Sequence, residues 1–226
     1  MAEITLHGML GSPNVFRVAF ALEMRGLKYA HNEDLESEQF LKSSQWGMMP
    51  SLTIDGVSRS ESIALIEWLE DKFDQNPLLP EDADERALAR SWFYRVNSML
   101  TANRLTPVFN PAGVDAARSK MNHVLKDLDH ALAKHRFVVG DSASFADVEL
   151  GIFYLGYDLI KDRIGVDIDQ YPNVKKHKQM ITSLDAFKRI DVSESVVAFV
   201  KNPDMLKMIH ENQTKRIRRA QEHHQK

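Results

Sequence analysis

Two serines are each expected at the start of a helix, a position from which a hydroxyl can donate a hydrogen bond to an anion. Ser12 precedes Pro13 and an apolar helical repeat, and Ser62 follows Glu61 at the start of another such repeat. The first N–H groups of a helix and its partial positive charge favour a negative ligand. Ser62 therefore suits a carboxylate, and Glu61 suits an ammonium group. The alternative is that each serine is only a helix cap.

The composition excludes several other kinds of chemistry. Cysteine is absent from the 226 residues, which rules out disulfides, cysteine-liganded zinc, iron–sulfur centres and a cysteine nucleophile of the protein's own. With 29 basic and 32 acidic residues the net charge is −3, so we expect neither nucleic acid nor a membrane as partner. His123 and His130, like His223 and His224, lack acids at ligand spacing, and we expect no metal. Without a signal pattern after Met1 or an apolar run of roughly 18 residues, a cytoplasmic protein is expected.

The first third of the chain predicts a small mixed sheet with helices on it. Ile4 and Leu6, two apart, indicate a strand, and an apolar face predicts a helix that begins at Pro13 and ends at Gly26. Asp55-Gly56 between two β-like stretches indicates a hairpin. The other elements expected here are a weak strand over 28–32, a short helix around 39–41 and a helix over 63–73.

From Asp84 onward the chain predicts long helices and no convincing strand. The two prolines within 76–80 indicate a linker before them. Ser144 to Asp147 forms a capping box in front of the apolar run 148–155, which predicts a buried helix, so Asp147 is expected to be a cap rather than an acid catalyst. Other helices are expected over 87–100, 118–135, 174–181 and 193–200.

Several short motifs occur in an order and spacing that is more informative than any one of them. They are Ile4–Gly8, Ser12–Val15, Gly47–Leu52, Glu61–Leu65, Ser144–Asp147 and Tyr171–Val174. Together, over roughly residues 3–190, they resemble the cytosolic glutathione transferases. The resemblance implies an α/β plus all-α fold, with a thioredoxin-like N-terminal domain (βαβ-ββα), an all-helical domain, a homodimer and a role in detoxification. The expected divisions are a glutathione-binding domain over 1–76, a linker over 77–85, the helical domain over 86–200 and a C-terminal helix with a basic tail over 201–226.

The resemblance to serine-type members (bacterial, phi-like or zeta-like) implies activation of the glutathione thiol for attack on a small hydrophobic electrophile. A cysteine thiol titrates near ~8.5, and each ~1.4 kcal/mol of preferential stabilisation lowers the pKa by about one unit. Ser12 would donate to the thiolate, and Asn14 would be a second donor or hold the γ-glutamyl group. A glutathione-dependent isomerase or peroxidase, and a non-catalytic binding or regulatory protein of the same family, are the alternatives.

The resemblance also assigns contacts to the rest of glutathione, the only co-substrate expected. Pro50 would be cis, with the backbone of Met49 bonding the cysteinyl part, whereas the alternative is a trans proline at the start of an edge strand. Glu61 and Ser62 would hold the two charged ends of the γ-glutamyl group.

The loop before this proline departs from the family. Many members have basic residues there for the glycine carboxylate of glutathione, whereas residues 33–38 are acidic here. Lys42 is the one cation and Gln45 the nearest amide. Four acids near an anionic tripeptide would weaken its binding, although by little at a solvated site.

An electrophile pocket is expected between the two domains. Its predicted walls are Met9 and Leu10 together with the long helix after the linker, of which Trp92, Arg95 and Met99 are the main candidates. A Trp and Met stripe is more often part of a core. The sequence does not indicate which electrophile reacts.

The C-terminal segment is the part that the resemblance explains least. Apolar residues after Pro203 predict a helix, which would cover the mouth of the electrophile pocket or pack on the outer face of the helical domain. The stretch 215–226 has too few apolar residues for burial, so we expect it to fray and its deletion to leave folding and glutathione binding intact. Its basic cluster, Lys215 to Arg219, is typical of a solvated helix face.

Overall fold

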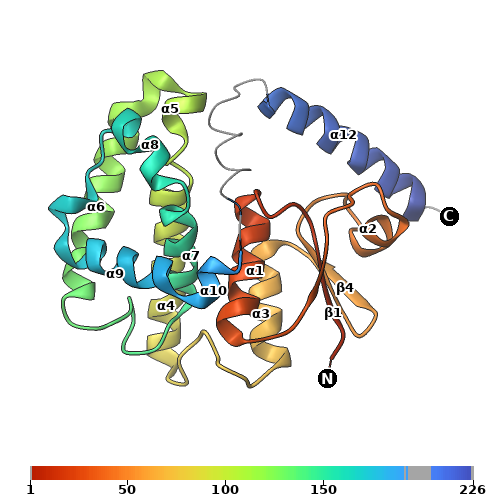
Figure 1. Ribbon diagram of the computed structural model, residues 1–226, viewed down its shortest axis with the longest axis horizontal. Helices are drawn as coiled ribbons and strands as arrows, with labels where there is room; N and C mark the ends of the chain where they lie inside the picture. Colours follow the sequence, from red (N-terminus) through yellow and green to blue (C-terminus); the bar gives the residue numbers. More distant parts are fainter. Residues whose placement is uncertain (1, 191, 193–204, 225–226) are drawn as a thin grey trace. The chain divides into compact units, whose positions relative to one another are not determined.

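The computed structural model describes residues 2–190, 192 and 205–224, and these form two compact units (Figure 1). The first unit runs to Asn76 and also includes the C-terminal segment from Ile190, while the second is Pro77–Arg189. The helix expected over 193–200 lies outside the described residues. No helix in the described ranges is long and apolar enough to cross a membrane.

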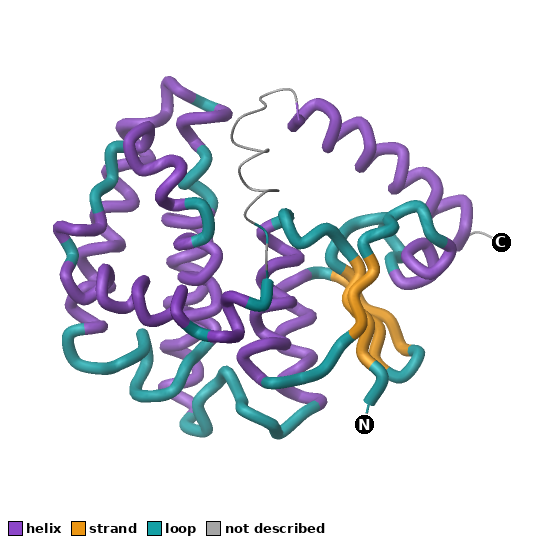
Figure 2. Tube along the Cα trace, in the orientation of Figure 1, coloured by secondary structure: helices purple, strands orange, loops and turns teal. Residues whose placement is uncertain are grey.

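The first unit is built on a four-stranded sheet in the order β2-β1-β3-β4, which Figure 2 shows in orange. The strands are β1 (Ile4–His7), β2 (Ala30–Asn32), β3 (Ser51–Ile54) and β4 (Val57–Ser60). β1 pairs with β2 in parallel and with β3 antiparallel, and β3 pairs antiparallel with β4. The predicted hairpin is confirmed, since Asp55 and Gly56 connect β3 to β4 with φ of 50° and 80°, both left-handed as a two-residue turn requires.

Helices cover both faces of this sheet. They are α1 (Pro13–Arg25), α2 (Glu38–Ser43) and α3 (Ser62–Lys72). α1 and α3 contact each other on one face, and α2 lies on the opposite face (Figure 1). All four side chains of β1 are buried as a result. Gly26, with φ of 66°, ends α1 as the sequence predicted.

The described residues of the second unit form helices joined by loops, and none of them forms a strand. Its elements are α4 (Ala83–Val96), a π-helical turn (Asn97–Thr101), α5 (Thr106–Phe109), a 3₁₀ turn (Pro111–Gly113), α6 (Val114–Leu132), α7 (Phe145–Tyr154), α8 (Tyr157–Ile164), a second 3₁₀ turn (Ile168–Gln170), α9 (Pro172–Ser183) and α10 (Asp185–Lys188). All ten residues of α7 are buried, and α7 contacts both α4 and α9. The predicted central helix and its capping box are therefore confirmed.

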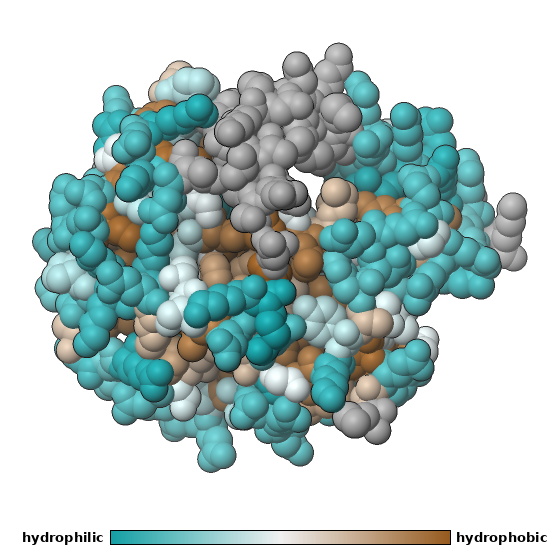
Figure 3. Space-filling view, in the orientation of Figure 1, coloured by the Kyte–Doolittle hydropathy of each residue, from teal (hydrophilic) through white to brown (hydrophobic). Residues whose placement is uncertain are grey.

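The C-terminal helix α12 (Met205–His224) corrects one expectation. It packs on α2 within the first unit. The predicted fraying from residue 215 is wrong, because the helix continues to His224 and buries Arg216 and Ala220. The buried residues that the structure describes in this helix are one small residue and one long charged residue, a composition that a count of apolar residues does not detect. The exposed side chains over residues 211–224 are hydrophilic (Figure 3).

Candidate functional site

Three segments that the sequence singled out are brought together at one end of the sheet. His7 of β1 is opposite Ser51 of β3, so the loop after β1 and the loop before β3 leave the sheet at the same end. The two loops pack closely, because a Cβ added to Gly8 would lie 2.6 Å from Val15 and 3.2 Å from the Cβ of Met49. The start of α1 and the loop before β3 are therefore neighbours.

Ser12 has an uncommitted hydroxyl at the start of α1. The residue occupies the N-cap position with φ of −75° and ψ of 128°, and Pro13 follows it in the first turn. Its carbonyl accepts from the N–H of Phe16 at 2.9 Å, but its half-buried side chain makes no capping hydrogen bond. Within the described part of the chain the hydroxyl has no other partner. The interpretation of Ser12 as only a cap therefore does not account for its side chain.

Arg17 ties the starts of α1 and α3 together, a role that the sequence did not reveal. The Nη1 of this buried residue donates to Asn14 Oδ1 at 2.8 Å and to Ser62 Oγ at 2.6 Å. Because Ser62 accepts this bond, its own hydroxyl proton is left for a ligand, and Asn14 keeps its amide N–H groups. The available signal was a single charge within the apolar stretch Val15–Phe20.

Glu61 and Ser62 form the start of α3. Glu61 is an exposed N-cap residue with φ of 73° and ψ of 104°, a conformation that costs a non-glycine residue roughly 1–3 kcal/mol. Its carboxylate has no partner among the described residues. Ser62 is buried at the first helical position, where backbone N–H groups and the helix dipole favour a carboxylate. A free carboxylate, which can bind an ammonium group, is thus next to a helix start that can bind a carboxylate. The two charged groups of a zwitterionic amino acid would fit this pair.

The loop before β3 contains the expected proline. The Met49–Pro50 peptide bond is cis, which confirms what the resemblance implied. The loop is fastened by Ser44, whose hydroxyl donates to the Met48 carbonyl at 2.7 Å. Met49 itself is half-buried next to Gly8.

The candidates for the glycine carboxylate are less well placed. Lys42 lies in an exposed ion pair with Glu38 at 2.6 Å, and this partner lowers the pKa of the Glu38 carboxyl. Gln45 is exposed at the end of the same helix and makes no hydrogen bond through its side chain within the described residues. A cation that is already paired attracts an incoming carboxylate weakly at such an exposed position.

The other acids of the 33–38 segment also have partners. Glu33 Oε1 accepts from the N–H of Leu10 at 3.3 Å, and Glu36 forms an ion pair with Arg219 of α12. Asp34 accepts from the N–H of Glu36 at 3.0 Å within the loop. Two of the four acids, Glu36 and Glu38, are thus paired with a cation, while Glu33 and Asp34 accept hydrogen bonds from backbone N–H groups and keep their charge.

His7, at the end of β1, is held neutral. It is fully buried, with its Nε2 3.1 Å from the Thr53 hydroxyl and its Nδ1 3.2 Å from the Asn32 amide. Burial, followed by the nearby charge of His31, lowers the pKa of His7 from 6.5 to about 4. The imidazole therefore serves as a neutral link between neighbouring strands at pH 7.

The predicted electrophile residues are divided between the units. Met9, half-exposed, and Leu10, half-buried, follow β1 in the first unit. In the second unit, Trp92 is half-buried, Met99 is 36% exposed and Arg95 Nη2 binds an Asp127 carboxylate oxygen at 2.5 Å. The predicted pocket stays a prediction.

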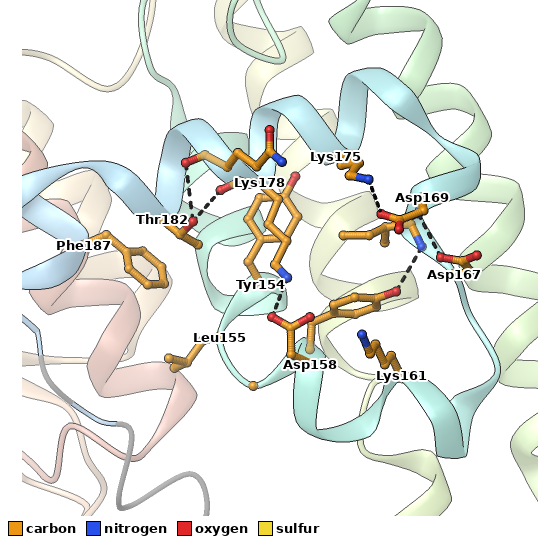
Figure 4. Close-up of a pocket in the computed structure, with 14 residues that line it drawn as sticks. Tyr154, Leu155, Asp158, Lys161, Asp167, Asp169, Lys175, Lys178, Thr182 and Phe187 are labelled. Atoms are coloured by element: carbon orange, nitrogen blue, oxygen red, sulfur yellow. Dashed lines mark hydrogen bonds and ion pairs between the residues drawn. The ribbon is translucent and has the colours of Figure 1, made fainter.

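A separate cavity of about 410 Å³ lies within the second unit, where α7 ends beside α8 and α9 (Figure 4). Lys178 Nζ lies 2.6 Å from Asp158 and 4.9 Å from the centre of the Tyr157 ring, and Lys175 lies 3.1 Å from Asp169. None of the residues predicted for the active site lines this cavity. Among the described residues no group of three or more histidines and acids is arranged to hold a metal.

Comparison with known proteins agrees with this geometry. The profile of the glutathione S-transferase N-terminal domain matches residues 6–77, and that of the C-terminal domain matches residues 93–185. A probable glutathione S-transferase of Nicotiana tabacum is 30% identical over 187 residues, which cover 78% of this chain and 82% of that protein. The chain belongs to the glutathione S-transferase family. The predicted family and fold are confirmed.

Two further relatives bear on the ligand. A maleylacetoacetate isomerase of Dictyostelium discoideum is 29% identical over 191 residues, covering 76% of this chain and 85% of that protein. The crystal structure of a rice glutathione transferase in complex with glutathione superposes with a TM-score of 0.76 at 26% identity, covering 88% of this chain and 95% of the rice protein. A member of the family with this fold thus binds glutathione.

Proposed function

We propose that this chain is a glutathione transferase in which Ser12 holds the thiol of glutathione as a thiolate for attack on a small hydrophobic electrophile. The observation that carries the proposal is the uncommitted Ser12 hydroxyl at the start of the 13-residue helix α1. Lowering the thiol pKa from ~8.5 to ~6.5 requires about 2.7 kcal/mol. A hydrogen bond to a charged group contributes roughly 1.5–3 kcal/mol and the helix dipole roughly 0.3–1 kcal/mol, which together are sufficient.

The rest of the tripeptide is bound by the groups around Ser12. Glu61 pairs with the γ-glutamyl ammonium, and the Ser62 hydroxyl with the first N–H groups of α3 binds the γ-glutamyl carboxylate. The backbone of Met49 bonds the cysteinyl part, and Asn14 supplies an additional donor. Met9 and Leu10 are the residues next to Ser12 that contact the electrophile. This assignment is supported by the adjacency of the three segments and by the partnerless Glu61 carboxylate.

The experiment compares the wild type with Ser12→Ala, using glutathione and an aryl halide. The apparent thiol pKa, read from the pH dependence of kcat/KM, should lie below ~8.5 in the wild type and rise by about one to two units in the variant. Turnover at pH 7 should fall roughly 3- to 25-fold, in proportion to the thiolate fraction. Ser91→Ala, at an exposed serine of α4, is the matched control and should behave as the wild type.

An unchanged pH profile in Ser12→Ala would move the role to Asn14 or to a backbone amide. Calorimetry tests the broader proposal independently. If reduced glutathione does not bind at about 10 mM, a concentration that detects even a Kd above 1 mM, the enzyme assignment fails and the non-catalytic alternative takes its place.

The likeness to maleylacetoacetate isomerases favours one second candidate, a glutathione-dependent isomerase. It would use the same thiolate, but glutathione would be regenerated in each turnover. Consumption of glutathione in proportion to product therefore distinguishes the transferase from the isomerase.

The proposed enzyme is a cytoplasmic homodimer. The cysteine-free sequence is suited to a reducing compartment, and members of the family pair in this way. Light scattering should give twice the 25.8 kDa of one chain, and a monomer mass would contradict the dimer.

A further inference from the structure

Helix α12 is seated on the loop that leads to the proposed glutathione contact. The backbone of Arg216 touches Gly47, since a Cβ added to this glycine would lie 2.6 Å from the Arg216 carbonyl oxygen. Gly47 has φ of 63°, which also disfavours any larger residue. Three residues before this contact along the helix, the Gln213 side-chain amide lies 2.9 Å from the Met48 sulfur. The C-terminal helix is thus within one or two residues of Met49.

Arg216 is a buried charge without an anion. Its residue is 8% exposed, its Nε lacks a hydrogen-bond partner, and no ion pair joins it to any described residue. Arg25, which is also buried, pairs with Glu70, and Arg219, on the same helix as Arg216, pairs with Glu36. Burial also lowers the pKa of the Arg216 guanidinium. A desolvated guanidinium is costly unless a carboxylate or phosphate accepts its hydrogen bonds.

The proposed ligand has one charged end that the first unit does not otherwise accommodate. Glu61 and Ser62 take the γ-glutamyl end and Met49 takes the middle, which leaves the glycine carboxylate. That group lies about one residue length, roughly 3.5 Å of chain, beyond the cysteinyl part. The loop residues near that position, Gln45, Gly47 and Met48, are neutral, and the cation Lys42 is already paired with Glu38.

We propose that Arg216 of the C-terminal helix binds the glycine carboxylate of glutathione, so that α12 completes the binding site of its own chain. This inference rests on the proposed function. The guanidinium supplies a forked pair of donors that matches a carboxylate, and its neutralisation by the ligand removes the cost of the buried charge. Arg216 thereby takes the place of the basic loop residues that many members of the family have.

The test measures binding of three ligands by calorimetry: glutathione, its glycine monoethyl ester and γ-glutamylcysteine, which lacks glycine. The wild type should bind glutathione at least ten-fold more tightly than either analogue, a difference of about 1.4 kcal/mol. Arg216→Gln should lose this preference, with at least ten-fold weaker binding of glutathione and binding of the ester within about two-fold of the wild type. Arg218→Gln, at an exposed position of the same helix, is the matched control and should keep the preference.

The other outcomes separate the role of Arg216 from the proposed function. If Arg216→Gln weakens all three ligands equally, or none, the inference is overturned while the proposed function stands. If the wild type binds none of them, both fail. Thermal melting without ligand separates a ligand role from a packing role, because loss of an unpaired buried charge should leave the melting temperature unchanged or raise it. Should Arg216→Gln fail to fold, Arg216→Met, which also removes the charge but keeps most of the apolar stem, takes its place. If Arg216→Met also fails to fold, or melts well below the wild type, the inference is overturned.

Discussion

The buried carboxylate of Asp147 joins three parts of the helical unit. Its Oδ1 accepts from the N–H of Val138 at 3.0 Å and lies 2.9 Å from His177 Nε2. Its Oδ2 accepts from both the N–H and the hydroxyl of Ser144, each at 2.8 Å. One side chain thus links the start of α7, the loop before it and α9.

Asp147→Ala should therefore destabilise the protein severely. The substitution removes four hydrogen bonds and leaves the N–H groups of Val138 and Ser144 buried without acceptors. Each unsatisfied buried donor costs about 1–3 kcal/mol, so the free energy of unfolding should fall by roughly 3–5 kcal/mol. At about 2–4 °C per kcal/mol for a chain of this size, the melting temperature should fall by roughly 6–20 °C. Asp147→Asn keeps one carbonyl acceptor and should cost less.

Calorimetric melting and turnover at 20 °C together check this reasoning. Asp162→Ala, at an exposed position of α8, is the control and should change the melting temperature by less than about 2 °C. Since Asp147 is a cap, kcat of the folded variant should equal that of the wild type. A melting temperature within about 3 °C of the wild type would refute the hydrogen-bond accounting. A loss of kcat with stability intact would instead make Asp147 a participant in catalysis.

Two more predictions concern the first unit. The pKa of His7 is about 4 in the folded protein against 6.5 for the free side chain, so as the pH falls the unfolded chain takes up a proton first. His7 should therefore cost up to roughly 3 kcal/mol of stability between pH 6.5 and 4 and nothing above that window, and urea unfolding of His7→Gln should lack this loss. Arg17→Leu, which unties Asn14 from Ser62, should raise KM for glutathione roughly 10- to 100-fold. An unchanged KM in steady-state kinetics would show that Arg17 is not needed to position the starts of α1 and α3.

The features that the sequence predicted correctly are those whose cause is local. Asp55-Gly56 makes its turn with the two left-handed residues that the dipeptide favours, and the turn fixes the register of β3 and β4. Ser144 and Asp147 cap α7 through bonds across three residues of one turn. A pattern within a few residues is sufficient to predict such elements.

The features that could not be predicted from the sequence depend on residues far apart in the chain. Arg17 meets Ser62 across 45 positions, and no periodicity in α1 or α3 indicates that contact. Helix α12 is a second case, because burial there depends on Ala220 and on the missing side chain of Gly47 rather than on large apolar residues. The close approach of the α12 backbone to the loop at Gly47 depends on both segments, so the sequence of either one alone does not indicate it.

The acidic segment 33–38 shows why a count of charges is a poor guide to binding at this site. Summed from the sequence, its four acids oppose an anionic ligand. In the structure, Lys42 and Arg219 each pair with one of those acids, and the field of the other two is screened at an exposed surface. The same pairing removes Lys42 as a receptor for the ligand. What attracts an anion is a desolvated charge without a protein partner, and among the basic residues beside this loop that description fits Arg216.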